Sequence, residues 1–461
     1  MKLKRFIGKQ IRGYMDFDIE FDETLNFLIG INGTGKTTIL KLLAGLLSPS
    51  YIELSQIEFS EIKLICRKYS NSEYNIITNT CKKNDKILVL TIEDSVKSKE
   101  IQEKFPLYEI KSSAKSFGRE TINIEKLHQI IYDFEDLEVV RYIKDLKTPL
   151  FLGLNRRANE KDRITQIQRD SYYRHRSSNF DLMYDSVDSA LSEIQEMFYN
   201  HIRQKAESQY AISNLFRKKV FAESFKVDEY YPIYNFVYSN ELEELENRRK
   251  KLNDAIDNLD VGDLSTQFSE YFDSIKRALD DLYSASIHKN DEQANSEYVK
   301  ALLQWMIKSS QIERIDNIIR YANEYSNNIQ RLNEPIIRFV DSVNLFFNES
   351  NKEIEIDNQG EVVIKIKNVK KKRFSVFELS SGEKQLIIML AHIAFNNKNK
   401  NTSILIIDEP ELSLHISWQE LFVDALLKAS PNAQYILATH APAIISRIER
   451  RKNCIDLTKK N

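Results

Sequence analysis

A glycine-rich segment near the amino terminus has the residue types and spacing of a phosphate-binding loop. An apolar run, 25–29, leads into it, and a helix-like run, 38–47, follows it. Glycines let backbone N–H groups approach phosphate oxygens closely. Lys36 is expected to reach the β- and γ-phosphates, and the Thr37 hydroxyl to bind Mg²⁺. A glycine turn without a ligand is the alternative, which the complete pattern disfavours. The residues expected to contact the nucleotide are Gly30, Ile31, Asn32, Gly33, Thr34, Gly35, Lys36, Thr37 and Thr38.

A second segment, Leu379 to Gln385, places two serines and a glycine before a helix-like apolar run. Hydroxyl and N–H groups at the start of a helix suit a γ-phosphate. Taken alone the string is weak, because Ser-Ser-Gly-Glu is also an ordinary helix cap. Ser380, Ser381 and Gly382 are the candidate contacts.

Two later strands end in polar residues. The buried-strand pattern 404–407 ends in Asp408 and Glu409, and the strand-like run 435–438 leads through Thr439 to His440. Asp408 is expected to hold Mg²⁺, directly or through water, and Glu409 to polarise the attacking water as a general base. A lone histidine after a strand is more often structural. His440 is interpreted as catalytic because the other three motifs precede it in order.

The distribution of glycine indicates how these motifs are carried. Gly262 is the only one of eleven glycines between Asn155 and Gln359. A long stretch without helix breakers favours helices, whereas the two ends alternate short apolar strands with loops and helices. The prediction is an α/β, P-loop ATPase head split in sequence by a mainly helical, coiled-coil-like insertion. The expected parts are an amino-terminal lobe at 1–155, the insertion at 156–345 and a carboxy-terminal lobe at 346–461.

Two segments of the insertion have heptad spacing, one from Leu242 to Leu259 and one from Ile315 to Ile336. They favour a coiled-coil-like arm, and amphipathic helices packed on a globular core are the alternative. After the insertion, the alternation around 357–360 predicts a β-hairpin. Basic clusters at 370–373 and 172–176 are interpreted as solvated surface rather than nucleic-acid sites.

Composition limits the remaining classes. A net charge of -2 predicts no strong non-specific attraction to nucleic acid or anionic membrane. Three scattered cysteines suggest neither a zinc site nor a disulfide framework, so a cytoplasmic location is expected. The longest apolar run, 386–395, contains His392 and is too short to span a bilayer. No contact with membranes is expected.

The order of these motifs resembles the ABC-type ATPases of the SMC, Rad50, RecF and OLD class, over roughly residues 1–50 and 350–457. The resemblance implies a homodimer in which ATP lies between the phosphate loop of one head and Ser380, Ser381 and Gly382 of the other. A higher homo-oligomer is also expected. The glutamine with which this class senses magnesium and water has no clear counterpart; Asn155 is the candidate substitute, so hydrolysis is expected to be slow.

The stretch Glu409 to His415 is similar to a narrower branch, the anti-phage ATPases AriA of PARIS and PtuA of Septu and some retrons. This resemblance implies an antiviral sensor or assembly platform, triggered by DNA or a phage protein, that controls a separate effector encoded nearby. The effector is expected on another polypeptide, since only 21 residues follow His440. The resemblance implies that it is a TOPRIM or HNH nuclease. The alternative is a RecF-like or SMC-like repair or chromosome-maintenance ATPase that clamps DNA.

The first prediction concerns the phosphate loop. Lys36→Ala should abolish ATP binding and leave the protein folded, because Lys36 is expected in a solvent-facing loop, where its loss removes a phosphate partner rather than core packing. Calorimetric titration with Mg-ATP measures the binding, and circular dichroism checks the fold. Unchanged affinity would refute the assignment of the loop.

Overall fold

The computed structural model describes residues 1–48, 51–70, 73–96, 99–107, 137–145, 150–152, 186–226, 238–259, 265–287, 292–367, 373–395 and 404–458. The chain forms two compact units. The head unit comprises Met1–Tyr199 and Pro335–Asn461, and the insertion unit comprises Asn200–Glu334. This is an α/β head interrupted by a helical insertion, as the sequence predicts. The boundaries expected at 155/156 and 345/346 stay predictions.

A parallel sheet in the order β14-β3-β13-β12-β8 separates two hydrophobic clusters of the head unit. In β13, Tyr435 and Leu437 belong to one cluster, and Ile436 and Ala438 belong to the other. Successive side chains of a strand point to opposite faces, so a strand covered on both faces is apolar throughout. The strands are β3 (Leu25–Ile29), β8 (Leu150–Leu152), β12 (Ile404–Asp408), β13 (Gln434–Ala438) and β14 (Cys454–Asp456).

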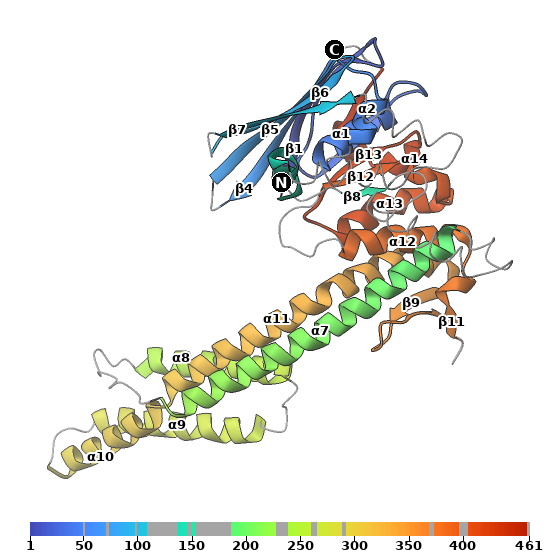
Figure 1. The fold of residues 1–461 in the computed structure, drawn as a ribbon. Helices are drawn as coiled ribbons and strands as arrows, with labels where there is room; N and C mark the ends of the chain where they lie inside the picture. The colour runs from blue at the N-terminus through green and yellow to red at the C-terminus, as the bar shows by residue number, and fades with distance from the viewer. Residues whose placement is uncertain are drawn as a thin grey trace, which may run out of the picture. The chain divides into compact units, whose positions relative to one another are not determined.

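Helices cover both faces of this sheet (Figure 1). Helix α1 (Lys36–Leu47) packs on the face of Ile436, and helices α12 (Ser381–Phe395) and α13 (Ile416–Ala429) pack on the face of Leu437. The apolar run 386–395 is therefore a buried core helix. No helix in the described part of the chain is long and apolar enough to cross a membrane.

An antiparallel sheet in the order β2-β1-β4-β5-β6-β7 closes the other side of α1 (Figure 1). Side chains along its strands alternate between the inner and the outer face, as in β6, where Leu88, Leu90 and Ile92 are buried. Strands β4, β5, β6 and β7 were not predicted from the sequence. The elements of this lobe are β1 (Lys2–Ile11), β2 (Met15–Glu20), α2 (Tyr51–Gln56), β4 (Glu61–Ser70), β5 (Glu73–Lys83), β6 (Ile87–Asp94), β7 (Lys99–Pro106) and α5 (Glu138–Asp145).

The hairpin predicted around 357–360 is confirmed. Strands β9 (Lys352–Ile356) and β10 (Val362–Ile366) pair antiparallel, and β11 (Arg373–Ser375) extends the sheet. Gly360 has a φ of 95°, and a Cβ there would lie 3.0 Å from the Tyr199 backbone. Only glycine fits this turn without strain.

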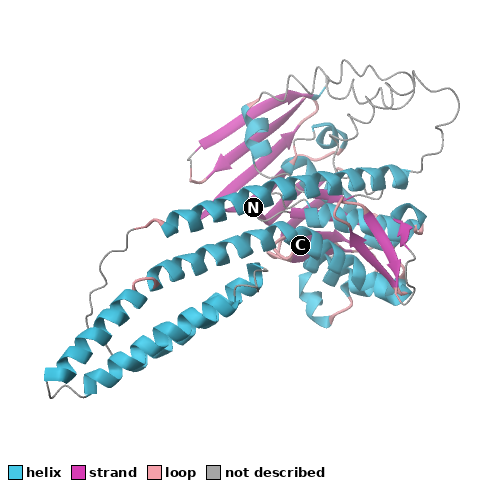
Figure 2. Ribbon diagram, turned by 90° about the horizontal axis from the view of Figure 1, so that it is seen from below, coloured by secondary structure: helices cyan, strands magenta, loops and turns pink. Residues whose placement is uncertain are grey.

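The described residues of the insertion unit are helical and contain no strand (Figure 2). The unit has its own core, in which Leu245 and Leu252 of the first heptad segment are buried with Phe272 and Trp305. Burial on one face fits both interpretations of the heptads, and the coiled coil stays a prediction. The helices are α8 (Tyr238–Leu259), α9 (Ser265–Ile287) and α10 (Glu292–Ser309), with parts of α7 (Ser186–Ser224) and α11 (Ile312–Phe347).

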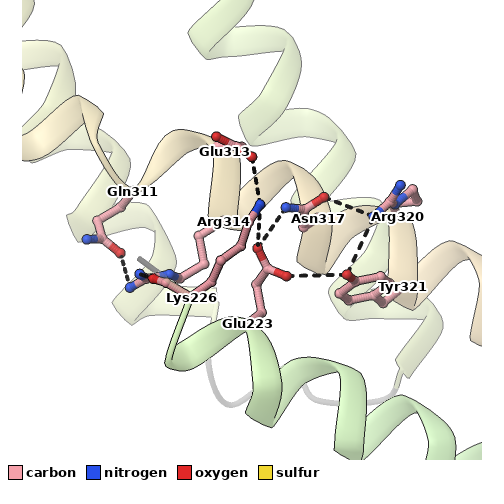
Figure 3. A network of polar contacts seen from close by, with 8 residues as sticks. All are labelled: Glu223, Lys226, Gln311, Glu313, Arg314, Asn317, Arg320 and Tyr321. Carbon is pink, nitrogen blue, oxygen red and sulfur yellow. Dashed lines mark hydrogen bonds and ion pairs between the residues drawn. The ribbon is translucent and has the colours of Figure 1, made fainter. Parts of the chain in front are cut away.

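A buried carboxylate joins α7 to α11 within the insertion unit (Figure 3). Glu223 accepts hydrogen bonds from Asn317 Nδ2 at 2.7 Å and from the Tyr321 hydroxyl at 3.3 Å. Lys226 Nζ lies 3.8 Å from Glu223 and 2.8 Å from Glu313. A buried charge is tolerated where it is paired and hydrogen-bonded, so this network fixes the register of the two helices.

The second prediction concerns Gln434, which is fully buried and ties the parallel sheet to β1. Leu3 N donates to Gln434 Oε1 at 2.6 Å, and Gln434 Nε2 donates to the carbonyls of Leu3 and Asp22. Gln434→Leu removes three hydrogen bonds at about 1 kcal/mol each and leaves buried backbone groups unpaired. The apparent melting temperature should fall by several degrees.

Differential scanning calorimetry measures this loss. Gln359→Leu, at an exposed turn position, is the matched control and should melt like the wild type. Equal melting temperatures for the two variants would contradict the assigned role of Gln434.

Candidate nucleotide-binding site

The phosphate loop joins β3 to α1, the context that the sequence predicts. Gly30, Gly33 and Gly35 have φ values of 152°, 89° and 92°, in the region that favours glycine. A Cβ on Gly33 would have nothing within 4 Å, whereas a Cβ on Gly35 would lie 3.2 Å from Phe17 and 3.4 Å from Met15. The loop is therefore open on its outer side and packed against β2 at its base, which suits a phosphate cradle.

The expectation that Lys36 lies in a solvent-facing loop is wrong. The residue is 5% exposed, and its Nζ donates to the carbonyl oxygens of Gly30 at 2.9 Å and Ile31 at 3.2 Å. Burial lowers the pKa of Lys36, and the nearby carboxylates of Glu409, Asp408 and Glu411 act in the opposite direction. The ammonium group lies inside the loop because the loop carbonyls there supply acceptors.

The other predicted loop residues have different surroundings. Thr34 Oγ1 donates to the Ile31 carbonyl at 2.9 Å and closes the loop. Ile31 and Asn32 are exposed at its tip, whereas Thr38 is buried in α1. The Thr38 side chain therefore packs within the head, and the expected contact of this residue with the nucleotide stays a prediction.

The structure brings the two predicted metal ligands together. Thr37 Oγ1 donates to Asp408 Oδ1 at 3.4 Å, although 371 positions separate them in sequence. Burial raises the pKa of Asp408, and the Thr37 hydrogen bond acts against this rise. A buried carboxylate beside a hydroxyl is the hard oxygen donor set that Mg²⁺ prefers. These residues fit the ion. The described residues contain no group of three or more His, Cys, Asp or Glu side chains that could hold a metal.

Glu409 has an unusual backbone. Its φ of 47° and ψ of 57° are left-handed, a conformation that non-glycine residues adopt rarely. Its N–H donates to the Ala438 carbonyl at 2.9 Å, and the 3-10 helix η4 (Pro410–Ser413) begins directly after it. The chain therefore turns sharply at the predicted general base. Backbone strain of this kind occurs at functional sites.

His440 follows β13, as predicted, and its side chain is exposed. Its N–H donates to Glu411 Oε1 at 2.6 Å. The preceding residue, Thr439, donates its N–H to the Leu28 carbonyl at 3.2 Å. The loop that carries His440 is thus bonded to the strand before the phosphate loop and to the turn after Glu409.

The second motif forms a helix cap, and the contact of Ser380, Ser381 and Gly382 with a γ-phosphate stays a prediction. Ser380 and Glu383 form a reciprocal pair, with Ser380 Oγ donating to Glu383 Oε2 at 2.8 Å and Glu383 N donating to Ser380 Oγ at 3.4 Å. Burial acts to raise the pKa of Glu383, but hydrogen bonds from Lys352 and Ser380 outweigh it and lower the pKa. Ser381 is exposed at the first turn of α12, and Gly382 is partly exposed.

The cap and the phosphate loop remain separate in this chain. Hydrogen bonds and ion pairs recorded among the described residues join Glu383 to Lys352 and Lys384 to Asp188, and none joins 380–382 to the loop. Asn155 and the cluster 172–176 lie outside the described residues. So does the basic cluster 370–373 apart from Arg373, which begins β11.

Sequence reasoning missed two parts of this site. Glu411, whose carboxylate bonds the His440 loop, lies within the stretch Glu409 to His415 but was not predicted as a site residue. Met15 and Phe17, which support Gly35, belong to a strand with an ordinary alternating pattern. A third carboxylate close after Asp408 and Glu409 was the available signal for Glu411. No comparable signal marked the other two.

Comparisons with known proteins find a family, curated relatives and solved structures that are similar to this chain. The AAA ATPase domain family matches residues 1–445. The chain is 25% identical over 290 residues to the retron Vc95 probable ATPase of Vibrio cholerae serotype O1 biovar El Tor, covering 57% of this chain and 54% of that protein. It is 28% identical over 204 residues to the retron Ec83 probable ATPase of Escherichia coli, covering 42% of this chain and 35% of that protein.

The chain thus spans about half or less of the length of these curated relatives. Among solved structures, it is similar to the Smc head domain with an extended coiled coil from Pyrococcus furiosus, with 12% identity, a TM-score of 0.33 and coverage of 96% of this chain and 91% of that one. It is similar also to the SMC head domain from Thermotoga maritima, with 10% identity, a TM-score of 0.35 and coverage of 97% and 92%.

Proposed function

This chain belongs to the AAA ATPase domain family, and we propose that it uses ATP binding and slow hydrolysis to control a separate effector in anti-phage defence. ATP hydrolysis is the activity of the family. The observation that carries the proposal is the meeting of three loops at one edge of the parallel sheet. Lys36, Asp408, Glu409 and His440 lie at or after the ends of adjacent strands there. Hydrogen bonds of Thr37, Glu409 N–H, Thr439 N–H and His440 N–H join these segments to one another.

In the proposed reaction each side chain has one task. Lys36 contacts the β- and γ-phosphates and leaves the loop carbonyls that it now binds. Glu409 orients the attacking water and accepts its proton, and His440 contacts the γ-phosphate. Mg²⁺, held by Thr37 and Asp408, would neutralise phosphate charge when bound.

We propose further that two heads dimerise around ATP. Ile31 at the loop tip is 72% exposed, and Leu412 in the turn after Glu409 is 66% exposed. Both follow the carboxyl ends of strands of one sheet, so apolar surface surrounds the nucleotide site on the side a partner would cover. Ser381 at the start of α12 would supply hydroxyl and N–H groups to the partner's γ-phosphate.

The defence assignment is supported by the two retron probable ATPases to which the chain is similar. The candidate catalytic and ligand-binding side chains among the described residues are all assigned to ATP. We therefore assign the destructive step to another polypeptide. An ATPase controls a partner only if its states bind that partner with different affinities. The helices of the insertion unit offer surface for such contacts and for a higher oligomer.

The third prediction concerns Glu409. Glu409→Gln should bind ATP like the wild type but release phosphate at least about a hundredfold more slowly, since an amide cannot accept the proton. The variant should also accumulate ATP-bound dimers, which light scattering detects. Phosphate release at the wild-type rate would exclude Glu409 as the base.

A second substitution tests the proposed dimer. Adding Ser380→Arg to Glu409→Gln should abolish the ATP-dependent dimer, because the bulky charge would stand where the two heads meet. Nucleotide binding should persist, since Ser380 has no bond to the phosphate loop of its own chain. A dimer that survives the second substitution would refute the arrangement in trans.

The fourth prediction concerns the partner. Expressed alone, this chain should be harmless; expressed with the neighbouring gene, it should form a complex and become toxic after phage challenge. Co-purification and survival counts measure both effects, with Lys36→Ala as the matched control that cannot bind ATP. Nuclease activity from this chain alone, or protection without the neighbour, would overturn the assignment.

A further inference from the structure

The sheet ladder ends one step after the last residues of β12 and β13. Asp408 pairs with Ala438 in parallel register, and Glu409 N donates to the Ala438 carbonyl. Beyond that bond the segments after β12 and β13 diverge, because Glu409 turns left-handed into η4. After β13, the next backbone N–H that points towards β12 is that of His440. The segment after β12 no longer offers a carbonyl for it.

Glu411 supplies the missing acceptor. Its Oε1 accepts the His440 N–H at 2.6 Å, so a side chain replaces the next rung of the ladder. Its Oε2 is buried and has no hydrogen-bond partner within the part of the chain that the structure describes. Holding an unpaired carboxylate oxygen away from water costs free energy, so the bond of Oε1 to the His440 N–H must offset part of that cost.

We infer that Glu411 is a positioning residue, which fixes the backbone of His440 relative to Glu409 and so sets where the exposed imidazole meets the γ-phosphate. This inference rests on the proposed ATPase function. A hydrogen bond to a charged group is shorter and stronger than one between neutral groups. This one joins the His440 backbone to the turn that begins directly after Glu409. Without the bond, His440 itself would lose this tie, and the segment would be held by its neighbours, through the bond of Thr439 to Leu28 before it and the buried side chain of Ile444 after it.

A double-mutant cycle tests the inference. Glu411→Ala should lower the hydrolysis rate at saturating ATP about ten- to a hundredfold, the effect of losing one charge-assisted hydrogen bond, without a matching loss of ATP affinity. Glu411→Gln keeps an acceptor and should recover most of the lost rate. If Glu411 acts through His440, the variant that combines Glu411→Ala with His440→Ala should be no slower than His440→Ala.

A second readout does not depend on turnover. Hydrogen exchange of the His440 amide should be slow in the wild type and in Glu411→Gln, and fast in Glu411→Ala. Glu420→Ala, at an exposed position of α13, is the matched control and should change neither readout.

Additive effects in the cycle, or equal exchange in the wild type and Glu411→Ala, would overturn the inference. Loss of amide protection in Glu411→Ala together with a wild type that hydrolyses no ATP would instead retract the proposed function, and the bond between the two loops would stand.

Discussion

Parallel pairing of β3, β13 and β12 is the constraint on which the site depends. The carboxyl ends of parallel strands lie at one edge of a sheet, and ligand sites of α/β proteins are found there. Because β13 lies between the other two strands, the loop of His440 is placed between the phosphate loop and the turn of Glu409. Side chains that are hundreds of positions apart in sequence are therefore neighbours, as Thr37 and Asp408 show.

Two charged side chains are buried at this edge. Asp408 is the last residue of β12, a strand covered on both faces by the two hydrophobic clusters, whereas Lys36 is enclosed by carbonyls of its own loop. Burial lowers the pKa of Lys36 and raises that of Asp408, which in each case favours the neutral form. Phosphate and a divalent cation would supply the opposite charges that these groups lack. The site is thus arranged for a ligand that carries both signs.

The insertion unit has a different kind of stability. It has a hydrophobic core of its own and a polar network around Glu223. Residues near the start of α12 are bonded to the base of α7 through Lys384 and Asp188. The helix that carries Ser381 is therefore joined to the segment from which the insertion begins.

The sequence by itself determined the chemistry. Glycines at fixed spacing, followed by Lys36 and Thr37, specify a phosphate loop because few other residue types permit that backbone and those contacts. The apolar run before Asp408 and Glu409 likewise specifies a buried strand that ends in carboxylates. These patterns are local, so they can be read in one dimension, and so can the glycine-poor stretch that becomes the helical insertion.

Only the tertiary structure decided which groups meet. Strand order and turns decide three features of the site. Lys36 is buried, Ser380 caps α12 through Glu383, and Glu411 bonds the His440 loop. The antiparallel sheet that contains β4 to β7 was not predicted either. Alternation of apolar and polar residues can indicate a strand, but it does not specify the strands with which it pairs. Contacts between distant segments are set by packing of the whole core, and a single sequence does not record them.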